Sequence, residues 1–330
     1  MPAIRRILFA VKDPDAARQP GIGKAIRIAR SFGASLELFH ALASPVIVAV
    51  PADDGESIDA LRSRALQHVR TRLARYVGIA RKHGVTLDVS ATWDYPPHEA
   101  IVRRAAQLRA DLIVAECHRG SRARRWMIRL TDWELLRASE LPVLLVRNAR
   151  PYRRPVVLAA IDPTHAHDKP ARLDADILAA ATQFSVALHG RLHVTFANQP
   201  PLGLLALGDP GIDARTVSMT YEALERQGRE AFERFMAARD LEPKRRHLEN
   251  GPPAQSIPAV ARRTHAALVV MGAVSRSRLQ RAFIGHTAER VLDALACDVL
   301  VIKPRGTRTP VDRRERGMRV VRPPATPLVA

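Results

Sequence analysis

The chain has 330 residues, of which 47% are hydrophobic and 26% charged, and its formal net charge is +19. This length fits two domains, and the balance is typical of folded globular proteins. The two cysteines, Cys117 and Cys297, argue against a disulfide framework or a four-cysteine zinc module. The apolar runs are too short for a signal-peptide core or a membrane span, so we expect a cytoplasmic protein. The positive charge favours anionic partners such as nucleotides, nucleic acid or acidic lipid surfaces.

Short apolar runs alternate along the chain with segments of helical spacing. Ile22, Ala25 and Ala29 recur on one helical face, and this pattern stops at Gly33. Pro97 suits the first turn of another helix. In the first half the predicted strands are Ile7–Val11, Leu36–Leu42, Thr86–Trp93, Asp111–Ala115 and Val143–Val146, and the predicted helices are about 21–32, Ser57–Lys82, from Pro97 onward, and Thr131–Ser139.

The second half repeats the first. A shift of 156 residues places Pro96-Pro97 on Pro252-Pro253 and Val143-Leu144 on Val299-Leu300. Two copies of one domain explain this agreement better than chance. The second copy predicts strands near Val156–Ile161, Arg191–Ala197, Lys244–Leu248, Leu268–Met271 and Val299–Ile302.

Alternating strands and helices predict an α/β fold with two tandem doubly wound domains. Each should be a five-stranded parallel sheet with helices on both faces. We assign residues 1–149 to the first domain and 155–304 to the second, and predict a disordered basic tail at 305–330. Ligands of such sheets bind beyond the carboxyl ends of the strands, where the strand order reverses.

Three segments of the second copy resemble the universal stress protein family. They are Met271-Gly272-Ala273-Val274-Ser275, Gly285-His286-Thr287-Ala288-Glu289 and Cys297–Pro304. The resemblance covers about 4–147 and 155–304 and implies an adenine nucleotide alpha hydrolase-like fold. It also implies a cytoplasmic stress-response protein, not an enzyme, that supports resistance to stress such as DNA damage. The two copies would pair within one chain, as single-copy members do in dimers; a homodimer of the whole chain is the alternative.

The resemblance also implies a site for ATP, with Mg²⁺, in the second copy. Members that bind ATP carry Gly, two residues, Gly, nine residues, Gly and then Ser or Thr. Glycines let phosphates approach the backbone, and the N–H groups at a helix start neutralise them. The matching positions form the predicted pocket, together with the Asp that ends the first strand: Asp162, Met271, Gly272, Ser275, Gly285, His286 and Thr287. Ser275 replaces the second Gly, and His286 replaces the Ser or Thr.

The first copy departs much further from this pattern. Glu116, Arg119 and Arg129 stand at the three glycine positions, and Leu130 stands at the hydroxyl position. Asp13 is the remaining match. Because Glu116 would repel phosphate, we expect no nucleotide in the first copy and a structural role in packing against its twin.

Other functions remain open on the residues alone. A weak Mg²⁺-dependent ATPase would use the second pocket. A nucleic-acid binder would use the arginine cluster, although a solvated loop is the favoured explanation of this cluster. Two short acid–histidine groups are weak metal candidates, and we predict no metal site. The arginine cluster is Arg119, Arg122, Arg124, Arg125 and Arg129; the metal candidates are Glu116-Cys117-His118 and His165, His167 and Asp168.

Overall fold

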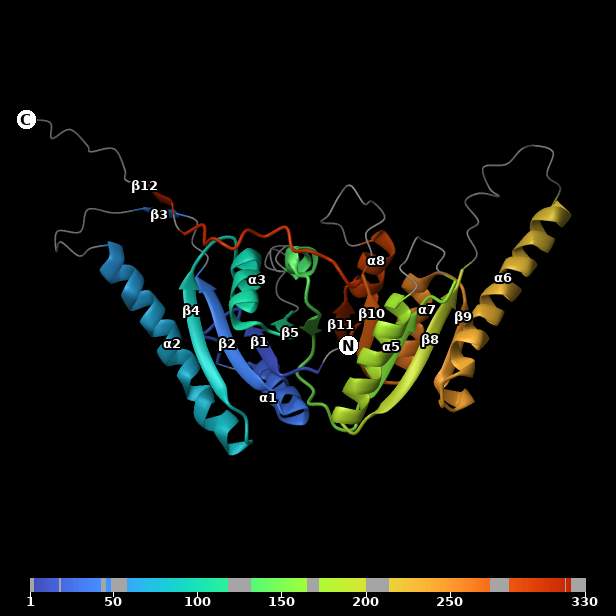
Figure 1. Ribbon diagram of the computed structural model, residues 1–330, viewed down its shortest axis with the longest axis horizontal. Coiled ribbons are helices and arrows are strands. Elements are labelled where there is room, and N and C mark those ends of the chain that lie inside the picture. Colours follow the sequence, from blue (N-terminus) through green and yellow to red (C-terminus); the bar gives the residue numbers. More distant parts are fainter. Residues whose placement is uncertain are drawn as a thin grey trace, which may run out of the picture. The chain divides into compact units, whose positions relative to one another are not determined.

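The computed structural model describes residues 3–17, 19–42, 46–48, 58–117, 132–164, 172–199, 214–273, 285–317 and 319–321 (Figure 1). It confirms the α/β fold with mainly parallel strands. The chain divides into two compact units. We call residues 2–141 with 309–330 the first unit, and residues 142–308 the second unit.

The first unit contains four parallel strands in the order β4-β2-β1-β5. The strands are β1 (Arg6–Ala10), β2 (Ser35–Leu42), β4 (Leu87–Trp93) and β5 (Leu112–Glu116), and the helices are α1 (Pro20–Phe32), α2 (Ile58–Lys82), α3 (Pro97–Leu108) and an unlabelled helix over 132–138. The predicted helix stop and helix start are confirmed. Gly33 ends α1 with a φ of 63°, and Pro97 occupies the first turn of α3.

The second unit contains six strands in the order β6-β11-β10-β7-β8-β9. The strands are β6 (Val143–Val146), β7 (Val156–Ile161), β8 (Arg191–Asn198), β9 (Arg246–Asn250), β10 (Ala266–Gly272) and β11 (Asp298–Ile302), and the helices are α5 (Arg172–Ala187), α6 (Ala214–Ala237), α7 (Pro253–Arg263) and α8 (His286–Ala294). Strands β7 to β11 are parallel, as predicted. Strand β6 pairs antiparallel with β11, so it belongs to this unit although its sequence repeat lies in the first copy. The predicted strand at Lys244–Leu248 starts later, because Pro243–Arg245 forms a 3₁₀ turn.

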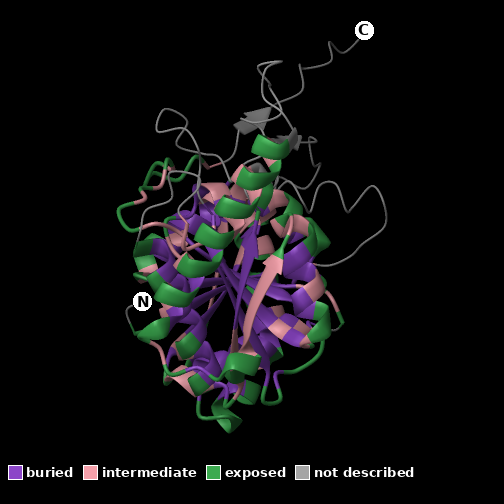
Figure 2. Cartoon of the chain, turned by 90° about the vertical axis from the view of Figure 1, so that its right-hand side faces the viewer, coloured by how far each residue is buried: buried purple, intermediate pink, exposed green. Residues whose placement is uncertain are grey.

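The strands form the core of each unit. Strands β5, β7 and β11 are buried along their whole length, as expected for parallel strands covered on both faces. In Figure 2 the strands inside the molecule are mostly purple, that is buried, whereas the helices around them carry green, exposed residues on their outer sides. In the described part of the chain, no helix is both long and apolar enough to cross a membrane.

A buried carboxylate fixes the segment that joins the two repeats. Asp298, which is fully buried, accepts hydrogen bonds from the Tyr152 hydroxyl at 2.6 Å and from the Arg147 backbone N–H at 2.8 Å. The backbone and side-chain amides of Asn148 also donate to it. Burial beside this carboxylate raises the pKa of Tyr152 well above its ordinary value. The join is therefore part of the second unit rather than a free linker.

The C-terminal segment differs from the expected disordered extension over residues 309–317. The Arg316 backbone N–H donates to Asp94 at 3.1 Å, and the Arg316 guanidinium pairs with Glu99 at 2.9 Å. The carbonyl of Asp312 accepts a hydrogen bond from Arg103. Farther on, β12 (Arg319–Val321) pairs with β3 (Val46–Val48). The segment is held because it supplies partners to charged groups of the first unit; residues 322–330 lie outside the described residues.

Two histidines on neighbouring strands make stability depend on pH. His193 Nδ1 lies 2.9 Å from His247 Nε2, so at least one ring must be neutral. Burial, His247 and nearby arginines lower the pKa of His193 to about 4, and burial and Arg263 lower that of His247. Between pH 6.5 and pH 4 the unfolded chain binds more protons at these histidines than the folded chain does. We therefore expect the free energy of unfolding to decrease as the pH is lowered through this interval.

Urea unfolding at pH 7.5, 5.5 and 4.5 measures this dependence. A His193→Gln/His247→Gln variant should lose less stability than the wild type over the same interval. A His83→Gln variant, changed at an exposed histidine, should follow the wild type. Parallel pH dependences in all three proteins would contradict the assignment.

Candidate functional site

In the second unit the strand order reverses between β7 and β10. From β7 the strand order continues to β8 and β9 on one side of the sheet and to β10 and β11 on the other side. Such a switch point is where doubly wound sheets bind ligands, beyond the carboxyl ends of the strands. Asp162 follows β7, while Met271 and Gly272 end β10. The structure therefore brings these three predicted site residues to one edge of the sheet.

Asp162 is held in one orientation by local hydrogen bonds. Its Oδ1 accepts from the Thr164 hydroxyl at 2.6 Å and from the Thr164 backbone N–H at 3.3 Å. Its own backbone N–H donates to Asp174, a buried carboxylate in the first turn of α5, at 2.8 Å. The end of β7 is thus tied to the start of α5, and the carboxylate is positioned before any ligand arrives.

Packing against α5 requires a glycine at position 272. A Cβ added at this position would lie 2.8 Å from Leu173 Cδ2 and 3.1 Å from Ile177 Cδ1. Both side chains belong to α5 and are buried. The expectation that this glycine opens space for a phosphate needs correction on the α5 side, because α5 fills that space.

This contact predicts the effect of adding one methyl group. We expect Gly272→Ala to lower the free energy of unfolding by about 1–3 kcal/mol, because Leu173 and Ile177 are too enclosed to move freely. Urea unfolding of Gly272→Ala, Leu173→Ala and the double variant tests the cause. If the clash is responsible, the double variant costs less than the sum of the two singles. Strict additivity would point to another origin.

The remaining predicted site residues lie at the start of α8. Gly285 is its N-cap residue, and the Gly285 carbonyl accepts from the Glu289 backbone N–H at 3.1 Å. Thr287, in the first turn, is exposed. His286 begins the helix, although its side chain is not described, and Ser275 lies outside the described residues. Because α8 connects β10 to β11, it starts at the same edge as Gly272.

Lys303 is a site residue that the sequence analysis missed. Gly272 pairs with Ile302 in the register of β10 and β11, and the Ala273 backbone N–H donates to the Ile302 carbonyl at 3.1 Å. Lys303 is the next residue after β11, and the alternation of side chains along this strand predicts that it faces away from α5. Right-handed crossovers place α8 on that same face. Burial lowers the pKa of Lys303 to about 8. The sequence signal that could have indicated Lys303 is its position directly after the last strand.

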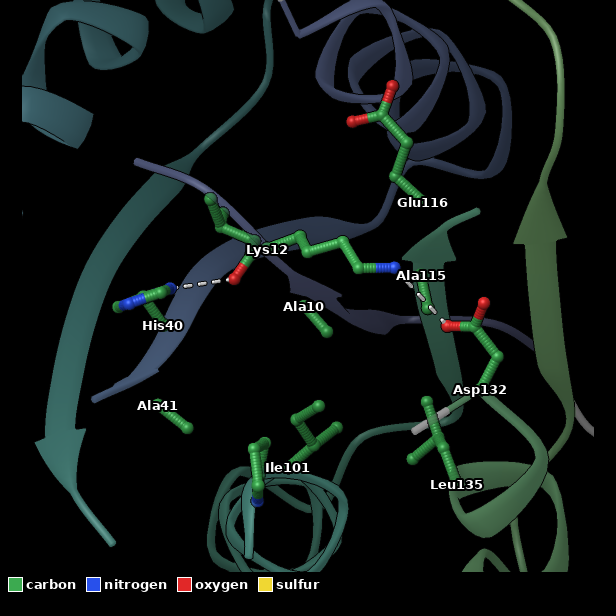
Figure 3. A pocket seen from close by; sticks show the side chains of 11 residues that line it. Ala10, Lys12, His40, Ala41, Ile101, Ala115, Glu116, Asp132 and Leu135 are labelled. Carbon is green, nitrogen blue, oxygen red and sulfur yellow. Dashed lines mark hydrogen bonds and ion pairs between the residues drawn. The ribbon is translucent and has the colours of Figure 1, made fainter. Parts of the chain in front are cut away.

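The first unit has a pocket of about 250 Å³ at its own switch point (Figure 3). Strand order reverses there between β1 and β5. The walls are mainly apolar, from Val11, Ile101 and Leu135, with alanines at the strand ends. Figure 3 shows Lys12 extending toward Asp132, and their charged atoms lie 3.8 Å apart.

Two further polar side chains of this pocket are satisfied within the first unit. The Glu116 carboxylate turns toward α1 and accepts from the Gly21 backbone N–H at 3.1 Å (Figure 3). A carboxylate is stabilised there by the positive end of the helix dipole. His40 Nδ1 lies 2.8 Å from the Val11 carbonyl, and burial lowers the pKa of this ring. Glu116 therefore already occupies the start of α1, a place that favours a negative charge.

Several other candidates fall outside the described residues. The arginine cluster lies in 118–131, and His165, His167 and Asp168 lie in 165–171. Over the part of the chain that is described, no group of three His, Cys, Asp or Glu side chains could hold a metal ion.

The fold and the two switch-point edges define a tandem α/β protein built from two doubly wound units. Comparison with known proteins gives the family. The Universal stress protein family matches residues 3–147 and 158–303, and the chain belongs to it. At the level of the family, the function is stress response.

Individual relatives have the same tandem arrangement. Universal stress protein E of Escherichia coli and that of Salmonella typhi are each 26% identical to this chain over 318 residues, covering 94% of it and 98% of the relative. A crystal structure assigned to the universal stress proteins, from Pseudomonas aeruginosa, is 27% identical with a TM-score of 0.69, covering 92% of this chain and 94% of its own. One from Archaeoglobus fulgidus, at 14% identity and a TM-score of 0.57, covers 93% and 97% and shares the fold.

Proposed function

We propose that this chain is a cytoplasmic stress-response module whose second copy binds an adenine nucleotide. The observation that carries the proposal is the pairing of β7 with β10 at a reversal of strand order, with Asp162 and Gly272 at the two strand ends. Its biological output would be resistance to stress such as DNA damage, through binding rather than turnover.

The described residues fit an anionic ligand on the α8 side of this edge. Lys303 supplies a cation there, and the first turn of α8 supplies backbone N–H groups. The α5 side does not fit, because Leu173 covers Gly272. Asp162 would hold the ribose or base side, and Mg²⁺ would accompany the phosphates to neutralise their charge.

The nucleotide is tested by mass spectrometry of small molecules released from gently purified, then denatured, full-length protein. We expect one adenine nucleotide per chain, and its loss in Asp162→Ala. Asp13→Ala, the same change at the matching position of the first copy, is the control and should retain the nucleotide. A spectrum without nucleotide, or equal loss in both variants, overturns the proposal. Phosphate release above background, lost in Asp162→Ala, would favour the competing ATPase function.

Lys303 predicts how nucleotide binding depends on pH. With a pKa of about 8 the amine is mostly charged at pH 7 and mostly neutral at pH 9, so affinity for an anion should fall across this interval. Titration calorimetry with ADP should show a decrease of about tenfold in the wild type, of the size that removing one charge contact produces.

The matched variants separate this effect from a general one. Lys303→Gln should bind weakly at pH 7 and show little further decrease at pH 9. Lys244→Gln, changed at a lysine whose side chain is 78% exposed, should retain the wild-type profile. A wild-type affinity that is constant from pH 7 to pH 9 would contradict the role of Lys303.

A further inference from the structure

The long helix that flanks each sheet differs in charge between the two copies. Helix α2 of the first unit and helix α6 of the second occupy the same place in the repeat (Figure 1). In chain order, α2 lies between β2 and β4, and α6 lies between β8 and β9. Helix α6 is balanced, with four arginines and four glutamates. Helix α2 carries seven basic residues against a single acid, Asp59: Arg62, Arg64, Arg70, Arg72, Arg75, Arg81 and Lys82.

The charge of α2 lies on its outward side. Val69, Leu73 and Ala80 are buried and form the face that packs on β4. Five of the basic side chains belong to exposed residues: Arg64, Arg70, Arg75, Arg81 and Lys82. Arg72 bonds the Asp15 carboxylate at 2.9 Å and Arg75 donates to the Ala16 carbonyl at 3.0 Å, so the outward face rests on Arg64, Arg70, Arg81 and Lys82. The exposed set extends over about 27 Å from Arg64 to Lys82 at 1.5 Å per residue.

We propose that the outward face of α2 binds the phosphate backbone of double-stranded nucleic acid without reading its sequence. Like charges held on a rigid rod repel one another, and a polyanion relieves that repulsion. A helix of this length extends over about 37 Å, close to the roughly 34 Å of one duplex turn. Arginine guanidinium groups also match phosphate oxygens in a two-pronged geometry that lysine lacks.

Other polyanions fit this face less well. Membrane binding by a helix needs an apolar face that enters the bilayer, but the apolar face of α2 is already used against the sheet. Among the α2 residues whose burial is described, the exposed large apolar ones are Leu61 and Ile79, which lie near opposite ends of the helix. Single strands are bound by stacking bases on aromatic rings, and Tyr76, the aromatic residue of α2, is half-buried and covered by Arg75.

The test measures binding of the full-length protein to a fluorescent 24-base-pair duplex at several salt concentrations. The α2 variant carries Arg70→Gln, Arg81→Gln and Lys82→Gln. The control carries Arg215→Gln, Arg226→Gln and Arg229→Gln on α6, which removes the same charge from exposed positions of the other helix. Thermal unfolding of all three proteins checks that each is folded.

We expect the α2 variant to bind at least tenfold more weakly at 0.1 M salt. The slope of log affinity against log salt should fall by about 2–3, since each lost phosphate contact contributes about 0.9. The α6 variant should stay within twofold of the wild type. Equal weakening in both variants would show that net charge, not this face, is responsible. Failure of the wild type to bind the duplex, or binding only to vesicles of anionic lipid, would also overturn the proposal.

Discussion

Replacing Asp298 with Ala should lower the free energy of unfolding of the second unit by about 3–5 kcal/mol. The carboxylate is fully buried and receives donors from Tyr152, Arg147 and Asn148. Its removal takes this acceptor from the fully buried Tyr152 hydroxyl and from the half-buried Arg147 and Asn148 amides, and losing the partner of a buried donor costs about 1–3 kcal/mol. Thermal unfolding should show the loss as a decrease of roughly 10 °C in Tm.

Two further variants show whether the network is the cause. Tyr152→Phe removes one of the bonds to the carboxylate and should cost about 1.5–3 kcal/mol, since hydrogen bonds to charged groups are stronger than neutral ones. Asp240→Ala, at an exposed aspartate of the same unit, should change stability by less than about 0.5 kcal/mol. If Asp298→Ala is no more harmful than Asp240→Ala, the join is not held as described.

Sequence patterns were sufficient for the strands of the two main sheets and most helices, but not for the short pair β3 and β12, which the patterns assign to a loop and to the tail. Val143–Val146 and Val156–Ile161 have the predicted bounds because their apolar runs end at polar or proline-containing segments. The partner of Val143–Val146 could not be predicted. Its antiparallel pairing with β11 depends on residues more than 150 positions away, which no local pattern records.

The site was predictable where it follows strand ends and not where it depends on packing. Asp162 and Met271–Gly272 meet at one edge because parallel strands share a carboxyl edge. The approach of α5 to Gly272 and the burial of Lys303 come from tertiary contacts. Likewise, Glu116 was interpreted as a residue that repels phosphate, whereas its contact with Gly21 shows how the first copy accommodates that charge.

Arg103 should be the second position with a large effect, because three carboxyl or carbonyl groups converge on it. Its side chain is 2% exposed, and its Nε donates to Asp94, itself 1% exposed, at 2.8 Å. Its Nη1 donates to Glu99 at 3.0 Å and to the Asp312 carbonyl at 3.3 Å. Arg103→Ala would leave Asp94 charged and buried beside Glu99, which should cost about 3–5 kcal/mol in the first unit.

The C-terminal segment provides a second readout of this network. Arg316 contacts Asp94 and Glu99, so losing Arg103 should loosen residues 309–317 and speed their cleavage by trypsin in the otherwise folded protein. Arg316→Ala should also speed cleavage but cost less than about 1 kcal/mol, because that side chain is 60% exposed. Arg103→Lys should restore little of the lost stability, because the lysine ammonium is a point charge and lacks the planar fork with which the guanidinium reaches its three acceptors. Suppose that Arg316→Ala is cleaved fast at unchanged Tm, whereas Arg103→Ala is cleaved as slowly as the wild type and keeps its stability. The segment would then dock independently of Arg103.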